Sequence, residues 1–149
     1  MKDSNECKLP HILTQTQHEV LIGGLLGDFC LTKEGKYPRM KVDRQALDKT
    51  YIDWEYNIFK NLCKSGVKEF ERYDKRYNKS HKYVSFRTRL VPAFLSYHNE
   101  WYPNNKRQVP ENIQFTPLIL AVWFADDGCI MNPQKNILTI KLSTESFGK

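Results

Sequence analysis

Two aspartates, Asp28 and Asp127, occupy corresponding places in two similar segments of the chain. When residues 21–31 are aligned with residues 120–130, the aspartate, the cysteine two residues later and the next aliphatic residue coincide. Each aspartate ends an apolar run of helical length, where a negative charge opposes the helix dipole. One such acid alone would be interpreted as an exposed helix-end residue. Its repetition indicates that something else, such as a bound metal ion, compensates the charge at both places.

The first acid ends a predicted helix over residues 16–28. Thr16 and Glu19 fit a capping box, in which the two side chains bond orphan amides of the first helical turn. Gly23 and Gly27 are four residues apart and share one face of this helix. Because a glycine inside a helix costs about 0.5–1 kcal/mol relative to alanine, these glycines indicate that another backbone packs closely against that face.

The second acid ends a predicted helix that begins at residues 116–117, a threonine N-cap followed by a proline at the first helical position. This helix has larger residues where the first has glycines. We therefore expect its close packing to rest on Ala121 and Ala125. Asp126, beside the second acid, is interpreted as a helix-end residue or a supporting acid.

The rest of the chain predicts an α+β fold with an antiparallel sheet that is apolar on one face. Alternation of polar and apolar residues places Arg39 and Lys41 of one strand, and Arg87 and Arg89 of another, opposite the apolar face. The predicted strands span residues 37–44, 67–73, 82–90 and 137–143, and the further helices span residues 48–66 and 92–102.

Positive charge is concentrated in the middle of the chain. The net charge is +6, and residues 60–110 hold 12 basic against 4 acidic residues, whereas the remainder holds 11 basic and 13 acidic residues. A region that binds a polyanion explains this distribution, and so does a solvated basic surface. Three aromatic residues in apolar helix patterns are interpreted as core residues rather than platforms for stacked bases, namely Trp54, Phe59 and Trp101.

Several classes of protein do not fit this sequence. No apolar run approaches the roughly 18 residues of a membrane span, and the N-terminus lacks the apolar stretch of a secretory signal. The four cysteines and four histidines show no zinc-ligand spacing, so the cysteines are interpreted as reduced. These features predict an intracellular protein of the cytoplasm or of an organelle matrix, mitochondrial or chloroplast.

The two aspartate segments resemble the LAGLIDADG motif of homing endonucleases, most closely in the single-chain form that carries both motifs on one polypeptide. The second segment, residues 116–128, is very similar to the second motif of that form. The similarity continues in residues 103–110 before it and residues 138–147 after it, and in total covers residues 14–149.

This resemblance implies an antiparallel sheet saddle over duplex DNA, with the two motif helices at a pseudo-twofold interface. Asp28 and Asp127 are implied to meet there and to bind Mg²⁺ or another divalent cation, so that a metal-activated water hydrolyses each strand. Arg107 occupies the position of the family's basic catalytic residue, where the family more often has lysine. The DNA-contacting residues predicted are Arg39, Lys41, Arg44, Lys75, Arg76, Lys82, Arg87, Arg89 and Lys106.

The two repeats are unequal in length. Residues 1–115 are predicted to form the first repeat, with a connecting segment at residues 103–115, and residues 116–149 begin a second. Because only residues 128–149 follow the second motif, the second repeat is expected to be an incomplete copy. A missing C-terminal half or a second chain is therefore an expected partner.

Proteins that resemble this family divide into nucleases, intron maturases that bind RNA for splicing, and non-catalytic DNA-binding proteins. A pure DNA binder does not require both acids. The predicted function is therefore that of an endonuclease of intron homing, which hydrolyses phosphodiester bonds of double-stranded DNA and is inactive as this short chain. A maturase that binds its host intron RNA and a non-catalytic DNA-binding protein are the alternatives.

Overall fold

The computed structural model describes residues 9–131 and 139–144, in which three helices and four strands form a first unit, and one helix and two strands come after it. The α+β class predicted from the sequence is confirmed. The first unit contains α1 (Gln15–Leu26), β1 (Cys30–Lys33), β2 (Pro38–Gln45), α2 (Lys49–Phe59), β3 (Lys68–Asp74), β4 (Lys79–Arg87) and α3 (Phe94–Trp101). The second segment contains α4 (Pro117–Asp127), β5 (Gly128–Met131) and β6 (Thr139–Leu142).

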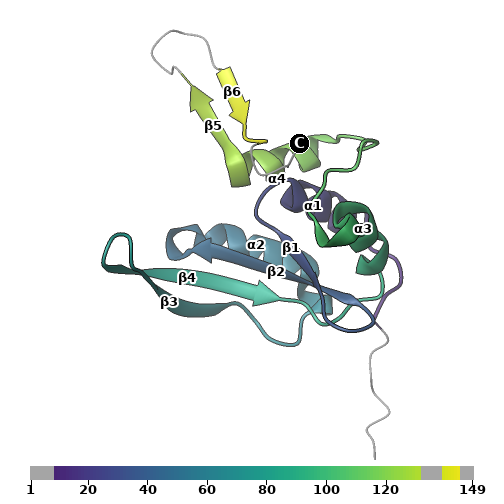
Figure 1. Ribbon diagram of the computed structural model, residues 1–149, viewed down its shortest axis with the longest axis horizontal. Coiled ribbons are helices and arrows are strands. Elements are labelled where there is room, and N and C mark those ends of the chain that lie inside the picture. The colour runs from purple at the N-terminus through teal and green to yellow at the C-terminus, as the bar shows by residue number, and fades with distance from the viewer. Residues whose placement is uncertain (1–8, 132–138, 145–149) are drawn as a thin grey trace, which may run out of the picture.

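The four strands of the first unit form an antiparallel sheet in the order β1-β2-β4-β3. The strands β5 and β6 form a separate two-stranded antiparallel sheet. In Figure 1 the helices of the first unit lie on one side of the larger sheet, and the β5–β6 hairpin extends away from it beyond α4. None of the helices in the described residues is long and apolar enough to cross a membrane.

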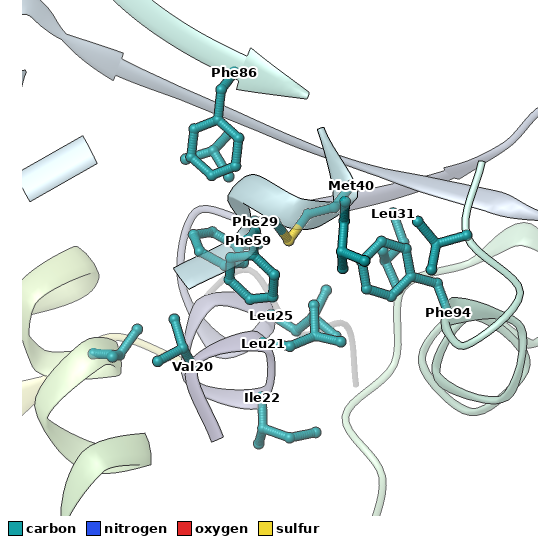
Figure 2. Close-up of a cluster of buried hydrophobic side chains, with 14 of the residues drawn as sticks. Val20, Leu21, Ile22, Leu25, Phe29, Leu31, Met40, Phe59, Phe86 and Phe94 are labelled. Atoms are coloured by element: carbon teal, nitrogen blue, oxygen red, sulfur yellow. The ribbon is translucent and has the colours of Figure 1, made fainter. Parts of the chain in front are cut away.

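The core lies between the helices and the apolar face of the larger sheet. Met40 of β2 and Phe86 of β4 point towards Leu21 and Leu25 of α1, and Phe59 of α2 fills the space beside them (Figure 2). These side chains are buried because alternate residues of β2 and β4 face the helices. The opposite face of the sheet carries mainly polar and charged residues, with the stacked rings of Phe70 and Tyr83 among them.

Helix α1 begins two residues before the predicted cap. Thr14, not Thr16, is the N-cap, and its capping box uses Gln17 instead of Glu19. Gln17 is the better partner because its amide also donates to the carbonyl of Ile58, at 2.9 Å, and so ties the helix start to α2. The helix ends at Leu26, so the predicted end at residue 28 is wrong by one half-turn.

Two of the three aromatic residues assigned to the core are there. Phe59 and Trp101 are fully buried. Trp54 is 40% exposed and stacks on Tyr51 on the outer side of α2, so its assignment to the core was wrong. The predicted strand over residues 137–143 is observed at Thr139–Leu142, and its first two residues lie outside the described part of the chain.

Candidate active site at the junction of the motif helices

Helices α1 and α4 pack together through residues that correspond in the aligned segments. A Cβ on Gly23 would lie 2.7 Å from the Cβ of its counterpart Val122, and one on Gly27 would overlap the side chain of its counterpart Asp126. Contacts between counterparts are expected where two similar units meet about a pseudo-twofold axis. The glycine face of α1 therefore makes the close contact that the sequence predicted (Figure 1).

The contact surface of α4 differs from the one predicted. Ala121 and Ala125 are exposed, whereas Val122 and Asp126 face α1. The prediction assumed that close packing needs small residues on both helices. Here the glycines of α1 supply the space, so α4 can carry larger side chains at the same contact.

The two predicted metal ligands lie at the same end of the crossed helices. Asp28 follows the C-cap residue of α1, and Asp127 is the last residue of α4. The carboxylate of Asp28 is 43% exposed. Burial raises the pKa of Asp127, and the negative charge of Asp28 raises it further, while Arg107 and Arg44 oppose both effects. The two acids are thus close enough to repel each other, and a shared cation would relieve that repulsion.

Arg44 was predicted to contact DNA, and the structure contradicts that prediction because its side chain is buried. It is only 6% exposed, on the helix-facing side of β2 with the buried apolar residues. Its Nε donates to the Glu55 carboxylate at 2.8 Å, and Nη2 donates to the other oxygen of that group. The guanidinium also donates to Asp28 at 3.0 Å and to Asp126 at 2.7 Å. A charged guanidinium can be buried here because three carboxylates surround it.

Asp126 connects the ends of the two motif helices. Its buried carboxylate accepts the backbone N–H of Asp28 at 3.1 Å and the hydroxyl of Tyr51 at 3.3 Å, in addition to the Arg44 guanidinium. Burial outweighs the attraction of Arg44 and raises the pKa of Asp126 to about 7. Burial also raises the pKa of Glu55. A single guanidinium therefore compensates only part of the negative charge gathered around it.

Arg107 approaches the same end of α1 from the segment after α3. Its guanidinium donates to the carbonyl of Gly27 at 2.8 Å and also to the carbonyl of Leu25. A cation is favourable at this point because the last carbonyls of a helix carry partial negative charge. The structure thus brings Arg107 close enough to lower the pKa of Asp127 and anchors it through the backbone of α1.

The outer face of the larger sheet, opposite the helices, carries basic residues beside this site. Arg39 and Lys41 of β2 and Arg87 of β4 alternate with buried apolar residues and therefore project outward. Lys41 is paired in register with Arg87. A cavity of about 490 Å³ at the end of this face is lined by five cations, Arg39, Lys64, Lys68, Arg87 and Arg89.

The family model of the LAGLIDADG DNA endonuclease family matches residues 18–149, nearly the whole chain. The chain belongs to this family. Helices α1 and α4 are its two LAGLIDADG helices, and the resemblance inferred from the sequence is confirmed.

Individual relatives include proteins of two kinds. The chain is 31% identical over 135 residues to the cytochrome b mRNA maturase bI2 of Debaryomyces hansenii, covering 87% of this chain and 50% of the maturase. It is 30% identical to the DNA endonuclease I-ChuI of Chlamydomonas applanata, covering 92% of this chain and 68% of that enzyme. The homing endonuclease I-WcaI, solved bound to its DNA recognition sequence, matches with a TM-score of 0.81 at 25% identity, covering 91% of this chain and 62% of that protein.

The chain matches only part of the length of two of these relatives. It spans about half the length of the Debaryomyces maturase and less than two thirds of I-WcaI. The similarity to I-WcaI confirms the fold, including the antiparallel sheet and the paired motif helices.

The remaining predicted DNA-contacting residues are distributed over different parts of the sheet. Lys82 lies on the same side of β4 as the buried Val84 and Phe86, although it is exposed beyond the helices. Lys75 and Arg76 lie in the turn between β3 and β4, where Arg76 pairs with Asp74. Lys106 is exposed and precedes Arg107 in the chain. Arg89 lies just after the end of β4.

Three basic residues of the outer face escaped the sequence analysis. Lys64 and Lys68 line the basic cavity, and Arg72 stacks over the rings of Phe70 and Tyr83. Lys68, Phe70 and Arg72 alternate along β3 and pair with outward residues of β4, so they lie on the outer face. Strand pairing was needed to interpret this alternation, since β3 is exposed along nearly its whole length and has no clear apolar face.

Proposed function

We propose that this chain acts as part of a site-specific DNA endonuclease that hydrolyses phosphodiester bonds of double-stranded DNA with a divalent cation, Mg²⁺ by preference. The observation that carries the proposal is the meeting of Asp28 and Asp127 at the end of the two motif helices, with Arg107 anchored beside them. The names of I-ChuI and I-WcaI support this activity.

The two acids suit a magnesium ion that takes its other ligands from the substrate. Within the described residues, no group of three or more histidine, cysteine or acidic side chains could hold a metal ion alone. Mg²⁺ is commonly bound by one or two carboxylates together with water and substrate phosphates. Mutual repulsion of Asp28 and Asp127 favours a cation between them. When bound, such a cation neutralises charge on the phosphate and activates a water molecule.

The protein's own side chains then have separate tasks. Asp28 and Asp127 hold the cation, and the backbone anchoring of Arg107 keeps its positive charge near the phosphate that is cut. The outer face of the sheet contacts the DNA backbone and base edges, with Arg39, Lys41 and Arg87 in its central strands. This arrangement would place the duplex across the sheet next to the two acids.

Cleavage tests the role of the acids. In a protein with a complete second repeat, Asp28→Asn and Asp127→Asn should each abolish cutting of a target selected from a random duplex library, while DNA binding stays within a few-fold of the unsubstituted protein. Asp53→Asn is the matched control, because it neutralises a surface acid whose ion pair, among the described residues, is with Lys49. Near-normal cutting by either motif variant would remove that acid from the mechanism.

Binding tests the assignment of the sheet faces. Arg87 and Lys82 lie on the same strand and on opposite faces. Arg87→Ala should weaken DNA binding and lower the slope of log affinity against log salt by about one unit, as expected for a lost phosphate contact. Lys82→Ala should leave both nearly unchanged. Equal effects of the two substitutions would show that the outer face is not the DNA surface.

An intron maturase is the second candidate, because the chain is 31% identical to the Debaryomyces bI2 maturase. An RNA-splicing role would require binding to a host intron RNA through the same basic surface. Filter binding to that RNA, with the intronless DNA target as competitor, separates the two functions. We place either activity in an organelle matrix, since the maturase acts on cytochrome b mRNA by its name.

A further inference from the structure

Arg44 and Asp126 form a polar junction that the proposed cleavage chemistry does not use directly. The junction joins β2 through Arg44, α2 through Glu55, the end of α1 through Asp28, and α4 through Asp126. Tyr51 closes it, with its ring 4.4 Å from the guanidinium carbon and its hydroxyl on Asp126. The Asp28 carboxylate thus has a partner that is itself held by two further acids.

Within the part of the chain that the structure describes, the junction has no counterpart on the other side of the helix pair. Gly27 is the counterpart of Asp126 in the aligned motifs and carries no side chain. Strand pairing shows which residue of the second hairpin corresponds to Arg44. Cys30 pairs with Lys41, and its counterpart Cys129 pairs with Lys141. Arg44 lies three residues after Lys41, and Thr144 lies three residues after Lys141. The counterparts of Asp126 and Arg44 are therefore Gly27 and Thr144, which cannot form an ion pair.

Steric exclusion explains why only one copy of the junction can form. The two counterparts face each other across the helix contact, and a Cβ on Gly27 would overlap the side chain of Asp126. The space on the axis holds one carboxylate and not two. An ion pair at this place must therefore favour one acid of the motif pair over the other.

We propose that Arg44, held by Asp126 and Glu55, is a positioning residue for Asp28 and not for Asp127, so that the two motif acids are unequal ligands for a divalent cation. The guanidinium donates directly to Asp28 at 3.0 Å, and within the described residues its hydrogen bonds and ion pairs go to Asp28, Glu55 and Asp126. This inference rests on the proposed function. It adds that the two halves of the active site differ before any DNA is bound.

Two double-mutant cycles on the 149-residue chain test the inequality without metal or DNA. Arg44→Met is combined with Asp28→Asn in one cycle and with Asp127→Asn in the other, and the urea unfolding constant is measured for each variant. We expect coupling of about threefold or more in the first cycle and clearly weaker coupling in the second, where Arg44 acts on Asp127 through its charge. Equal coupling in the two cycles would overturn the inference. Should Arg44→Met fail to fold, the same cycles are run with Arg44→Lys.

Metal affinity separates a positioning role from a purely structural or electrostatic one. If Arg44 orients Asp28, Arg44→Met should weaken Mn²⁺ binding, measured by calorimetry, by about tenfold or more, and Arg44→Lys should restore part of the loss. If Arg44 acts only by repelling the metal cation, Arg44→Met should instead tighten Mn²⁺ binding. If its role is only structural, the affinity for Mn²⁺ should not change. Either result overturns the inference. Lys49→Met, which removes a cation from an exposed pair, is the control.

The outcomes also distinguish this inference from the proposed function. Absence of Mn²⁺ binding by the unsubstituted chain would count against the proposed metal site and against the unequal-ligand claim together. Normal Mn²⁺ binding with equal coupling of Arg44 to both acids would count against the inference alone.

Discussion

The two motif segments place similar side chains in very different surroundings. Leu21 of α1 is fully buried, whereas its counterpart Leu120 of α4 is 42% exposed. The contrast continues in the two hairpins, whose pairs correspond by register. Leu31 and Met40 pair in the first hairpin and are buried, whereas Ile130 and Ile140 pair in the second and are 52% and 60% exposed.

The difference arises from what covers each segment. In the first unit, α2, α3 and β4 cover the apolar faces of α1 and the β1–β2 hairpin (Figures 1 and 2). The second segment has the same kind of apolar face and, within the described residues, no equivalent cover. An apolar pattern predicts which side of an element can be buried, and the partner decides whether it is.

The largest expected effect comes from supplying that cover. We expect the 149-residue chain alone not to make double-strand cuts in a plasmid that carries its target, in the presence of Mg²⁺. A C-terminal cover built on the pattern of residues 46–101, fused or added as a separate chain, should bury Ile130 and Ile140 and restore cutting. Site-specific double-strand cuts by a soluble monomer of the short chain would contradict this expectation.

The next largest effect is the loss of unfolding free energy when the corresponding leucines, Leu21 and Leu120, are replaced by alanine. Leu21→Ala should lower the free energy of unfolding by about 2–5 kcal/mol, because it leaves a cavity in a packed core. Leu120→Ala should cost less than about 1 kcal/mol, because water already reaches that side chain. Urea unfolding of the two variants measures the difference. Similar costs would mean that α4 is covered in solution by a second copy of the chain, and a concentration series would reveal it.

Much of this arrangement was accessible from the sequence, because the repeated motif is a strong local signal. The apolar runs, the glycine face of α1, and the proline start of α4 predicted both motif helices and their contact. The basic residues Arg39, Lys41 and Arg87 were assigned to the outward face from alternation alone.

The failures share a physical cause, which is competition for partners that are distant in sequence. Arg44 follows the buried parity of β2, yet charge suggested an exposed residue, and only Glu55 and Asp126 make its burial possible. Asp126 was interpreted as a helix-end or supporting acid, but nothing local revealed that it would fill the space above Gly27. Such cross-element contacts require the tertiary structure.

A smaller effect is expected at the contact between the two motif helices. Gly23→Ala would bring a Cβ to 2.7 Å from the Cβ of Val122, and the overpacking should cost about 1–3 kcal/mol of unfolding free energy. Gly66→Ala is the matched control, because the nearest atom to its added Cβ is 4.0 Å away. Gly23→Ala should cost less when it is added to Val122→Gly than when it is made in the unsubstituted chain, because Val122→Gly removes the opposing Cβ. If Gly23→Ala is neutral, the helices do not meet as closely in solution.

The last expected effect is a pH dependence to which the second motif contributes through Asp126. Burial raises the pKa of Asp126 from its usual value of 3.8 to about 7, whereas its counterpart in the first motif is Gly27. An acid with a raised pKa stabilises the folded state fully below pH 3.8, and that contribution is lost as the pH rises through 7. Asp126→Asn does not titrate, so its unfolding free energy should rise relative to the unsubstituted chain by at most about 1.4 kcal/mol per pH unit between pH 4 and 7.

Asp74→Asn provides a control of opposite sign. Hydrogen bonds from Arg76 lower the pKa of Asp74, so the unsubstituted chain gains stability from this acid above its unfolded pKa and loses it as the pH falls. The difference between variant and unsubstituted chain should therefore fall with rising pH for Asp74→Asn and rise for Asp126→Asn. Urea unfolding at six pH values between about 2.5 and 7 measures both slopes, because the change for Asp74→Asn falls below about pH 4 and the change for Asp126→Asn falls between pH 4 and 7. A flat difference for Asp126→Asn would mean that Arg44 keeps Asp126 ionised throughout, and that burial is not the dominant influence on the pKa of this acid.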